Sequence, residues 1–177
     1  MNQKIIALIT FGFFGKEFLD AISISVSNEF QCSVIIKESR IDFGDFYDSG
    51  RRQYNANKFL MAVDTMIVPD STKVIGLCSI DLFIPIMTFI IGQAQLGGKT
   101  GIASMYRLGN EQYGLKPNDA LLLERFIKEI IHEIGHTFGL IHCFVPNCVM
   151  RSGSYVDDID QKDRHLCSNC RTKIGLE

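Results

Sequence analysis

The strongest constraint on this 177-residue chain is the spacing of three histidines, His132, His136 and His142. Residues four apart on a helix lie one turn apart on the same face, so the first two imidazoles can bind one metal ion. Apolar side chains fall on the opposite side of the helical wheel, which predicts a helix over about 117–138 with both imidazoles facing a cleft. Gly139 can adopt the left-handed conformation that ends a helix, which would return His142 to the same ion.

Three nitrogen ligands leave one tetrahedral position open, which is typical of a catalytic rather than a structural zinc site. Zinc lowers the pKa of a bound water toward about 7. Glu133 follows the first ligand and could accept the proton of that water and pass it to a leaving amine. The pattern therefore predicts hydrolysis of a peptide bond. A glutamate between two histidines four residues apart can occur by chance in a helix. Gly139 and His142 follow at three-residue steps, which makes chance a poor explanation. The alternative for Glu133 is an ordinary surface carboxylate.

Four of the six cysteines form two close pairs, Cys143 with Cys148 and Cys167 with Cys170. This spacing is typical of a closed structural zinc site with four thiolate ligands. The segment after residue 139 has too few large apolar residues for a core of its own, so a metal ion would supply its folding free energy. Two disulfides are the alternative.

Charge and hydropathy exclude some partners and favour one compartment. The net charge is −2 with no block of like charge, so we expect no nucleic-acid partner. The apolar run at 82–91 contains Pro85 and is too short to span a bilayer, so we expect no membrane partner. Glycines and charges interrupt the apolar N-terminal run, which argues against a signal peptide. We therefore expect a cytoplasmic protein, where clustered cysteines bind metal more often than they form disulfides.

Apolar periodicity predicts an α/β (α+β) fold with about three helices and five strands. A glycine pair, Gly97-Gly98, predicts a turn and an antiparallel hairpin between the last two strands. We expect one domain over 1–177, with an α/β lobe at 1–139 and a small irregular lobe at 140–177. The expected helices cover about 15–30, 52–68 (Phe59, Leu60, Val63, Met66 and Ile67 on one side) and 117–138; the strands cover 4–10, 32–37, 73–79, 85–92 and 100–108, and 38–50 is expected to be a loop.

The strings HEIGHTFGLIHC, PNCVM and CSNC resemble the archaemetzincins, a branch of the metzincin clan of zinc metallopeptidases. The resemblance implies a metzincin-like fold with a mixed, twisted five-stranded sheet and a zinc-stabilised C-terminal lobe. It also implies two zinc ions per chain and a substrate that adds as a strand to an edge at about 87–93. Its implied site residues are the catalytic zinc ligands His132, His136 and His142, the general base Glu133, the turning glycine Gly139, the methionine-turn residue Met150, and the structural zinc ligands Cys143, Cys148, Cys167 and Cys170.

The leading interpretation is a monomeric zinc metallopeptidase acting on peptides or unfolded protein segments. A zinc-stabilised peptide-binding module with little or no hydrolytic activity is the second interpretation, and a hydrolase of a non-peptide amide is the third. Three residues remain outside both predicted sites: His165 is expected at the surface, and Cys32 and Cys78 are expected as buried thiols in or beside strands.

Overall fold

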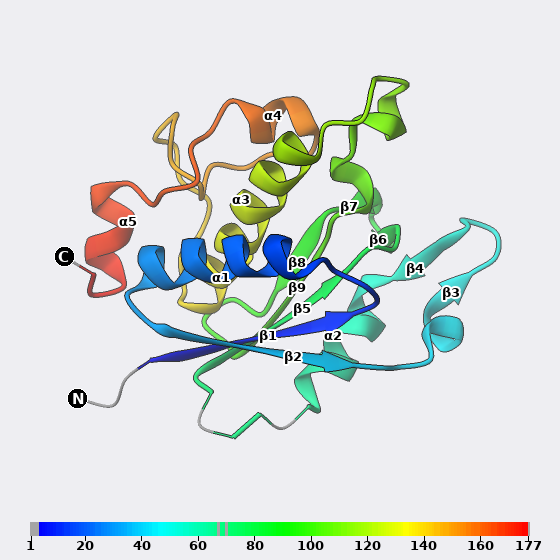
Figure 1. Cartoon of the computed structure of the whole chain (residues 1–177), viewed down its shortest axis with the longest axis horizontal. Coiled ribbons are helices and arrows are strands. Elements are labelled where there is room, and N and C mark those ends of the chain that lie inside the picture. The colour runs from blue at the N-terminus through cyan, green and yellow to red at the C-terminus, as the bar shows by residue number, and fades with distance from the viewer. Residues whose placement is uncertain (1–3, 67, 70, 177) are drawn as a thin grey trace.

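The computed structural model describes residues 4–66, 68–69 and 71–176, and it has a mixed α/β architecture with two sheets (Figure 1). The main sheet has five strands, as predicted, in the order β2-β1-β5-β9-β8. Its strands are β1 (Ile5–Phe11), β2 (Ser33–Ser39), β5 (Lys73–Cys78), β8 (Gly92–Ala94) and β9 (Thr100–Ser104). The long helices are α1 (Lys16–Phe30), α2 (Ala56–Asp64) and α3 (Asp119–Thr137).

The main sheet is covered by helices on both faces. Its strands are parallel except for the edge strand β8, which runs antiparallel to β9. Because side chains alternate along a strand, Ile6 and Leu8 of β1 pack with α1 and α3, whereas Ala7 and Ile9 pack with α2. The helices α1 and α3 lie on one side of the sheet and α2 on the other (Figure 1). The buried central strands explain the nearly continuous apolar runs in the sequence.

A second, small sheet was not predicted. Its order is β3-β4-β6-β7, and β3 and β4 project as a hairpin at one end of the molecule (Figure 1). The strands are β3 (Tyr47–Asp48), β4 (Gln53–Asn55), β6 (Leu82–Ile84) and β7 (Met87–Ile90). The prediction of a loop over 38–50 was therefore wrong in part, since β3 follows a short 3-10 helix at Phe43–Phe46.

The predicted helix over 52–68 was too long at both ends, since α2 covers only Ala56–Asp64. Residues 53–55 form β4, and α2 begins only after Asn55, whose side chain accepts a hydrogen bond from the backbone N–H of Lys58 at 3.2 Å. This side-chain cap sets the start of the helix. The apolar spacing was correct for Phe59 and Val63, which are fully buried, and the predicted Ile67 lies outside the described residues.

The predicted strand over 85–92 is divided between the two sheets. β6 ends at Ile84, and a turn at 85–86 reverses the chain into β7, because proline fixes φ and favours a turn. The hairpin at Gly97-Gly98 is confirmed, but its first strand is β8. Gly97 has a φ of +69°, a conformation that favours glycine.

The segment 140–176 is more regular than predicted and shares the core of the rest of the chain. It contains α4 (Val156–Asp160) and α5 (Ser168–Lys173). Its buried apolar residues belong to the same cluster as α1 and α3. Arg125 of α3 also binds Asp160 with two hydrogen bonds, at 2.7 and 2.6 Å. The few apolar residues of this segment are therefore buried against α3.

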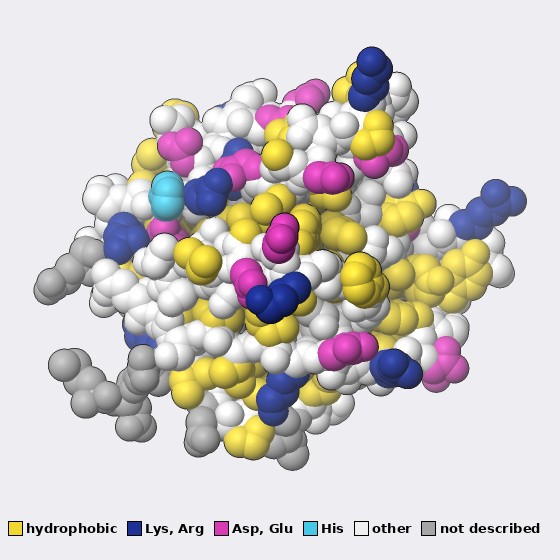
Figure 2. Space-filling model, viewed as in Figure 1, with side chains coloured by type: hydrophobic (Ala, Val, Ile, Leu, Met, Phe, Trp, Pro, Cys, Tyr) yellow, Lys and Arg dark blue, Asp and Glu magenta, His cyan; other side chains and the backbone are white. Residues whose placement is uncertain are grey.

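The surface agrees with the balanced charge of the sequence. On the face shown in Figure 2, acidic and basic side chains are interspersed, and no large area carries one sign. None of the helices in the described part of the chain combines the length and the apolar character that crossing a bilayer requires.

Candidate metal centres and active site

Helix α3 holds two histidines in defined orientations. Asn118 caps the helix by accepting a hydrogen bond from the backbone N–H of Leu121 at 3.0 Å. The Nδ1 of His132 is bonded to the carbonyl of Val149 at 2.9 Å, and the Nδ1 of His136 to the carbonyl of Leu140 at 2.7 Å. A carbonyl only accepts, so each Nδ1 carries the proton and each Nε2 lone pair is free for a metal ion.

The third histidine joins the first two as predicted. Gly139 has a φ of +90° and ends the helix, so the chain turns back toward the same site. The ring centroid of His142 lies 5.3 Å from that of His132 and 5.1 Å from that of His136. A ligand nitrogen from each of the three rings lies within 4.8 Å of the others.

The two helical nitrogens fit a zinc ion. The Nε2 atoms of His132 and His136 are 3.0 Å apart. Two nitrogens bound at 2.0–2.1 Å in a tetrahedron would be separated by about 3.3 Å. Burial lowers the pKa of all three imidazoles, which keeps them neutral and able to bind a metal ion. The donor set therefore suits zinc with one open position.

Glu133 is buried in a cleft of about 440 Å³ that the three histidines also line. Its Oε2 has no hydrogen-bond partner among the described residues. Burial raises the pKa of the carboxyl well above its usual range, the neighbouring Glu129 raises it further, and Lys162 lowers it. The interpretation of Glu133 as a surface carboxylate was therefore wrong.

The opposite wall of the cleft is the segment predicted to bind substrate. Residues of β7 and β8, from Met87 to Ala94, line it. β8 is the edge of the main sheet, so its outer backbone groups are available for pairing. Gly92 lies against the glutamate, because a Cβ at this position would be 2.6 Å from Oε1 of Glu133. Sequence reasoning missed Gly92.

Met150 packs against helix α3 at Gly135. Its side chain is fully buried, and a Cβ at Gly135 would collide with its Sδ. Glycine at 135 therefore lets the thioether approach the helix backbone closely. The backbone N–H of Cys143 donates to the carbonyl of Met150 at 2.9 Å, which ties the methionine segment to the residue after His142.

Lys162 is a buried residue of the site that sequence reasoning also missed. Its Nζ donates to the carbonyl of Arg151 at 3.0 Å and lies 3.5 Å from Nδ1 of His132. Two contacts therefore hold the backbone on either side of Met150. Lys162 binds the carbonyl of Arg151, and His132 binds the carbonyl of Val149. An isolated lysine in a polar segment gives no sequence signal for this role.

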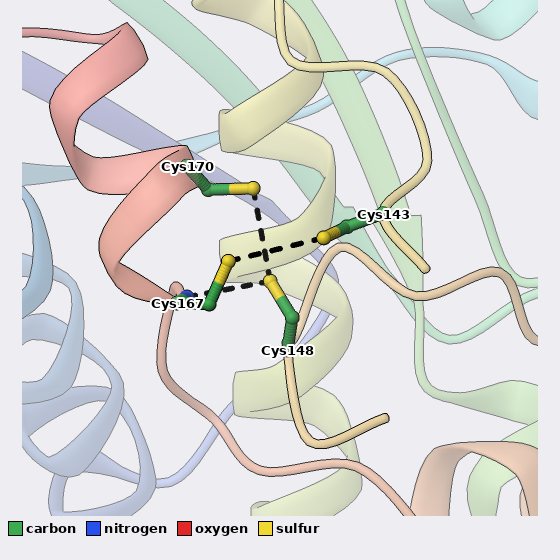
Figure 3. A group of neighbouring side chains, drawn as sticks. All are labelled: Cys143, Cys148, Cys167 and Cys170. Atoms are coloured by element: carbon green, nitrogen blue, oxygen red, sulfur yellow. Dashed lines mark hydrogen bonds between the residues drawn. The ribbon is translucent and has the colours of Figure 1, made fainter. Parts of the chain in front are cut away.

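The four clustered cysteines match a tetrahedral thiolate site. The Sγ atoms of Cys143 and Cys167 are 3.8 Å apart, as are those of Cys148 and Cys170 (Figure 3). Four sulfurs bound at 2.3 Å to a central zinc would be separated by about 3.8 Å, whereas a disulfide requires about 2.05 Å. All of the cysteines are free thiols, so the disulfide alternative was wrong.

The remaining cysteines and His165 lie where the sequence predicted. Cys32 and Cys78 are buried, and burial raises the pKa of the first thiol to about 11 and of the second to about 12. The side chain of His165 is 70% exposed, and its Nδ1 lies 2.7 Å from Oε2 of Glu29.

Glu29 of α1 orients the segment that carries Cys167 and Cys170. This buried carboxylate accepts hydrogen bonds from the backbone N–H of Leu166 at 2.9 Å and from Arg171 at 3.1 Å. The last cysteine pair is therefore positioned by α1, more than 130 residues earlier in the chain. Nothing in the local sequence around Glu29 indicates this contact.

The chain is similar to known proteins over nearly its whole length. A family model described as peptidase family M54 matches residues 4–175. The archaemetzincin of Methanocaldococcus jannaschii is 38% identical over 128 residues, which cover 72% of this chain and 69% of that protein. The archaemetzincin of Pyrococcus furiosus is 40% identical over 134 residues, covering 75% and 69%.

Solved structures agree with this result. The crystal structure of archaemetzincin from Methanopyrus kandleri superposes with a TM-score of 0.86 at 32% identity, covering 98% of this chain and 94% of that one. A zinc-dependent peptidase from Methanocorpusculum labreanum superposes with a TM-score of 0.85 at 28% identity, covering 96% and 99%.

The fold, the histidine-lined cleft and these relatives define the class of the protein as a zinc metallopeptidase. Within that class, the chain belongs to peptidase family M54, and its resemblance to the archaemetzincins is confirmed.

Proposed function

We propose that the chain binds two zinc ions with different roles. His132, His136 and His142 hold the catalytic ion, and the four cysteines Cys143, Cys148, Cys167 and Cys170 hold the structural ion. The convergence of unprotonated Nε2 atoms beside Glu133 supports the first site, and the 3.8 Å sulfur separations support the second. The substrate is a peptide or an unfolded protein segment.

In this proposal Glu133 moves the protons of the reaction. When bound, zinc acts as a Lewis acid on the scissile carbonyl and lowers the pKa of a water molecule. Glu133 accepts a proton from the attacking water and later donates it to the leaving nitrogen. Its unpartnered Oε2 supports this role, because no described residue occupies that oxygen with a hydrogen bond. The free edge of β8 holds the substrate backbone by strand addition.

The proposal extends to the organisation of the chain. Residues 1–177 form one metallopeptidase domain, with an α/β lobe at 1–139 and a second lobe at 140–177 that carries Met150 and the cysteine site. Gly139 is the hinge between the ligand helix and the second lobe. A monomeric state and a cytoplasmic location remain predictions, and size-exclusion chromatography and cell fractionation test them.

The decisive experiment compares Glu133→Gln with the wild type on a peptide library, with Glu38→Gln as the matched control at an exposed glutamate. We expect about two zinc ions per chain in all three proteins by mass spectrometry of the metal. We expect Glu133→Gln to lower peptide hydrolysis by at least ~10²-fold, and Glu38→Gln to leave it unchanged. Equal, negligible cleavage by the wild type and Glu133→Gln, with peptide still bound, would favour a binding module instead.

A further inference from the structure

A second hollow lies beside the cleft, on the far side of the third histidine. It has a volume of about 600 Å³ and runs between the loop 139–146 and helix α5. Ile141, Phe144 and Val145 form the loop side, and Asn169, Lys173 and Ile174 form the helix side. We call this hollow the loop groove.

The loop groove presents unusually exposed apolar side chains. Phe144 is 97% exposed and Ile141 is 62% exposed, and both lie in one short loop. A single exposed apolar residue is ordinary, but several around one concave site indicate a binding surface. No described contact within the chain covers Phe144.

The groove adjoins the catalytic cleft. Ile141 and His142 line both hollows, so a peptide that extends past His142 lies next to the groove. An extended peptide advances about 3.3 Å per residue, so a substrate that reaches the groove places there a residue away from the scissile bond. Both walls are also held in place, because Cys143 lies in the loop wall and Cys170 in the helix wall of the same cysteine site.

The charge of the groove selects among peptides. Lys173 is the one cationic side chain other than histidine in its described lining, and that lining contains no carboxylate. We infer that the loop groove is a subsite for the peptide substrate, which binds a bulky apolar side chain against Ile141 and Phe144 and favours a neighbouring substrate carboxylate beside Lys173. The inference rests on the proposed function, since the occupant is the continuation of the cleaved peptide.

The test uses three variants of the zinc-loaded chain of 177 residues. Phe144→Ser removes the apolar contact, Lys173→Glu reverses the charge, and Phe13→Ser is the matched control. Phe13 is 91% exposed and lines neither the cleft nor the groove. Zinc content and thermal unfolding are measured for each protein, and cleavage of a library of peptides about 14 residues long is profiled by mass spectrometry.

We expect a preference of the wild type for a bulky apolar residue at one position away from the scissile bond. Phe144→Ser should lower kcat/KM for peptides with that residue by about tenfold, and should leave truncated peptides that end before it unaffected. Lys173→Glu should change a preference for a neighbouring acidic residue into one for a basic residue. Phe13→Ser should match the wild type.

Two results would overturn the inference. One is a wild-type profile with no apolar preference away from the scissile bond, and the other is an unchanged profile for Phe144→Ser at full zinc content. Both presuppose that the wild type cleaves peptides. Loss of the proposed function is a different result, because the wild type would then cleave neither long nor truncated peptides.

Discussion

Gly92→Ala should slow peptide hydrolysis by displacing the side chain of Glu133. A Cβ at residue 92 would lie 2.6, 2.7 and 2.9 Å from Oε1, Cγ and Cδ of Glu133. Strand β8 cannot easily move away. Gly92 is paired with Ala103, and the backbone N–H of Gly97 in the following turn donates to the carbonyl of His136 at 2.9 Å. The carboxylate must therefore retreat.

The size of the effect follows from this displacement. Relief of the three contacts requires a shift of about 0.5–1 Å, and a misplacement of about 1 Å in a catalytic group costs roughly 10²-fold in rate, or about 2.7 kcal/mol of transition-state stabilisation. Stability should change little, because alanine in a strand is otherwise favoured over glycine by roughly 0.5–1 kcal/mol. We therefore expect kcat/KM to fall by about 10²-fold with zinc content and unfolding temperature preserved.

The assay is hydrolysis of one library-derived peptide, with zinc content measured on the same samples. Gly15→Ala is the control, since a Cβ there meets no atom within 4 Å. The reasoning would be refuted if Gly92→Ala kept kcat/KM within twofold of the wild type while Glu133→Gln was inactive. That outcome would mean that the carboxylate tolerates the displacement.

The other predictions concern packing and thiol protection. Alanine is favoured over glycine inside a helix by about 1 kcal/mol. In Gly135→Ala, however, the new methyl group would overpack against the buried Met150, so we expect the unfolding temperature to fall by about 2–6 °C. A rise of the unfolding temperature in calorimetry would contradict the close packing of Met150 on Gly135. In alkylation at pH 8 followed by mass spectrometry, no cysteine of the zinc-loaded protein should react, chelation should expose the four clustered cysteines, and denaturant should expose all six. Cys32 and Cys78 should stay protected after chelation, since burial raises their pKa to about 11 and 12; their early labelling would show that the α/β core depends on the metal.

The sequence predicted the four longer strands of the main sheet well because each of them carries its own signal, whereas the three-residue edge strand β8 was missed. Buried parallel strands such as β1 read as continuous apolar runs, and Gly97-Gly98 indicated the hairpin between β8 and β9. The second sheet was missed because strands of two to four residues are too short for periodicity to register. Pro85 was predicted to lie within a strand, but it lies in the turn after β6. That turn is stabilised by the pairing of β6 with β7, which the local sequence does not reveal.

The sequence alone predicted which side chains come together in the two candidate sites. Helical geometry places His132 and His136 on one face, Gly139 permits the return of His142, and four cysteines at metal-ligand spacing need little else to converge. These signals are local, so they are visible in one short segment. Only the tertiary structure decided what surrounds those ligands: Gly92 against Glu133, Lys162 behind His132, and Glu29 beneath the last cysteine pair. Such contacts join residues about 30 to 140 positions apart, and they depend on how the sheet, α1 and the C-terminal segment pack around α3.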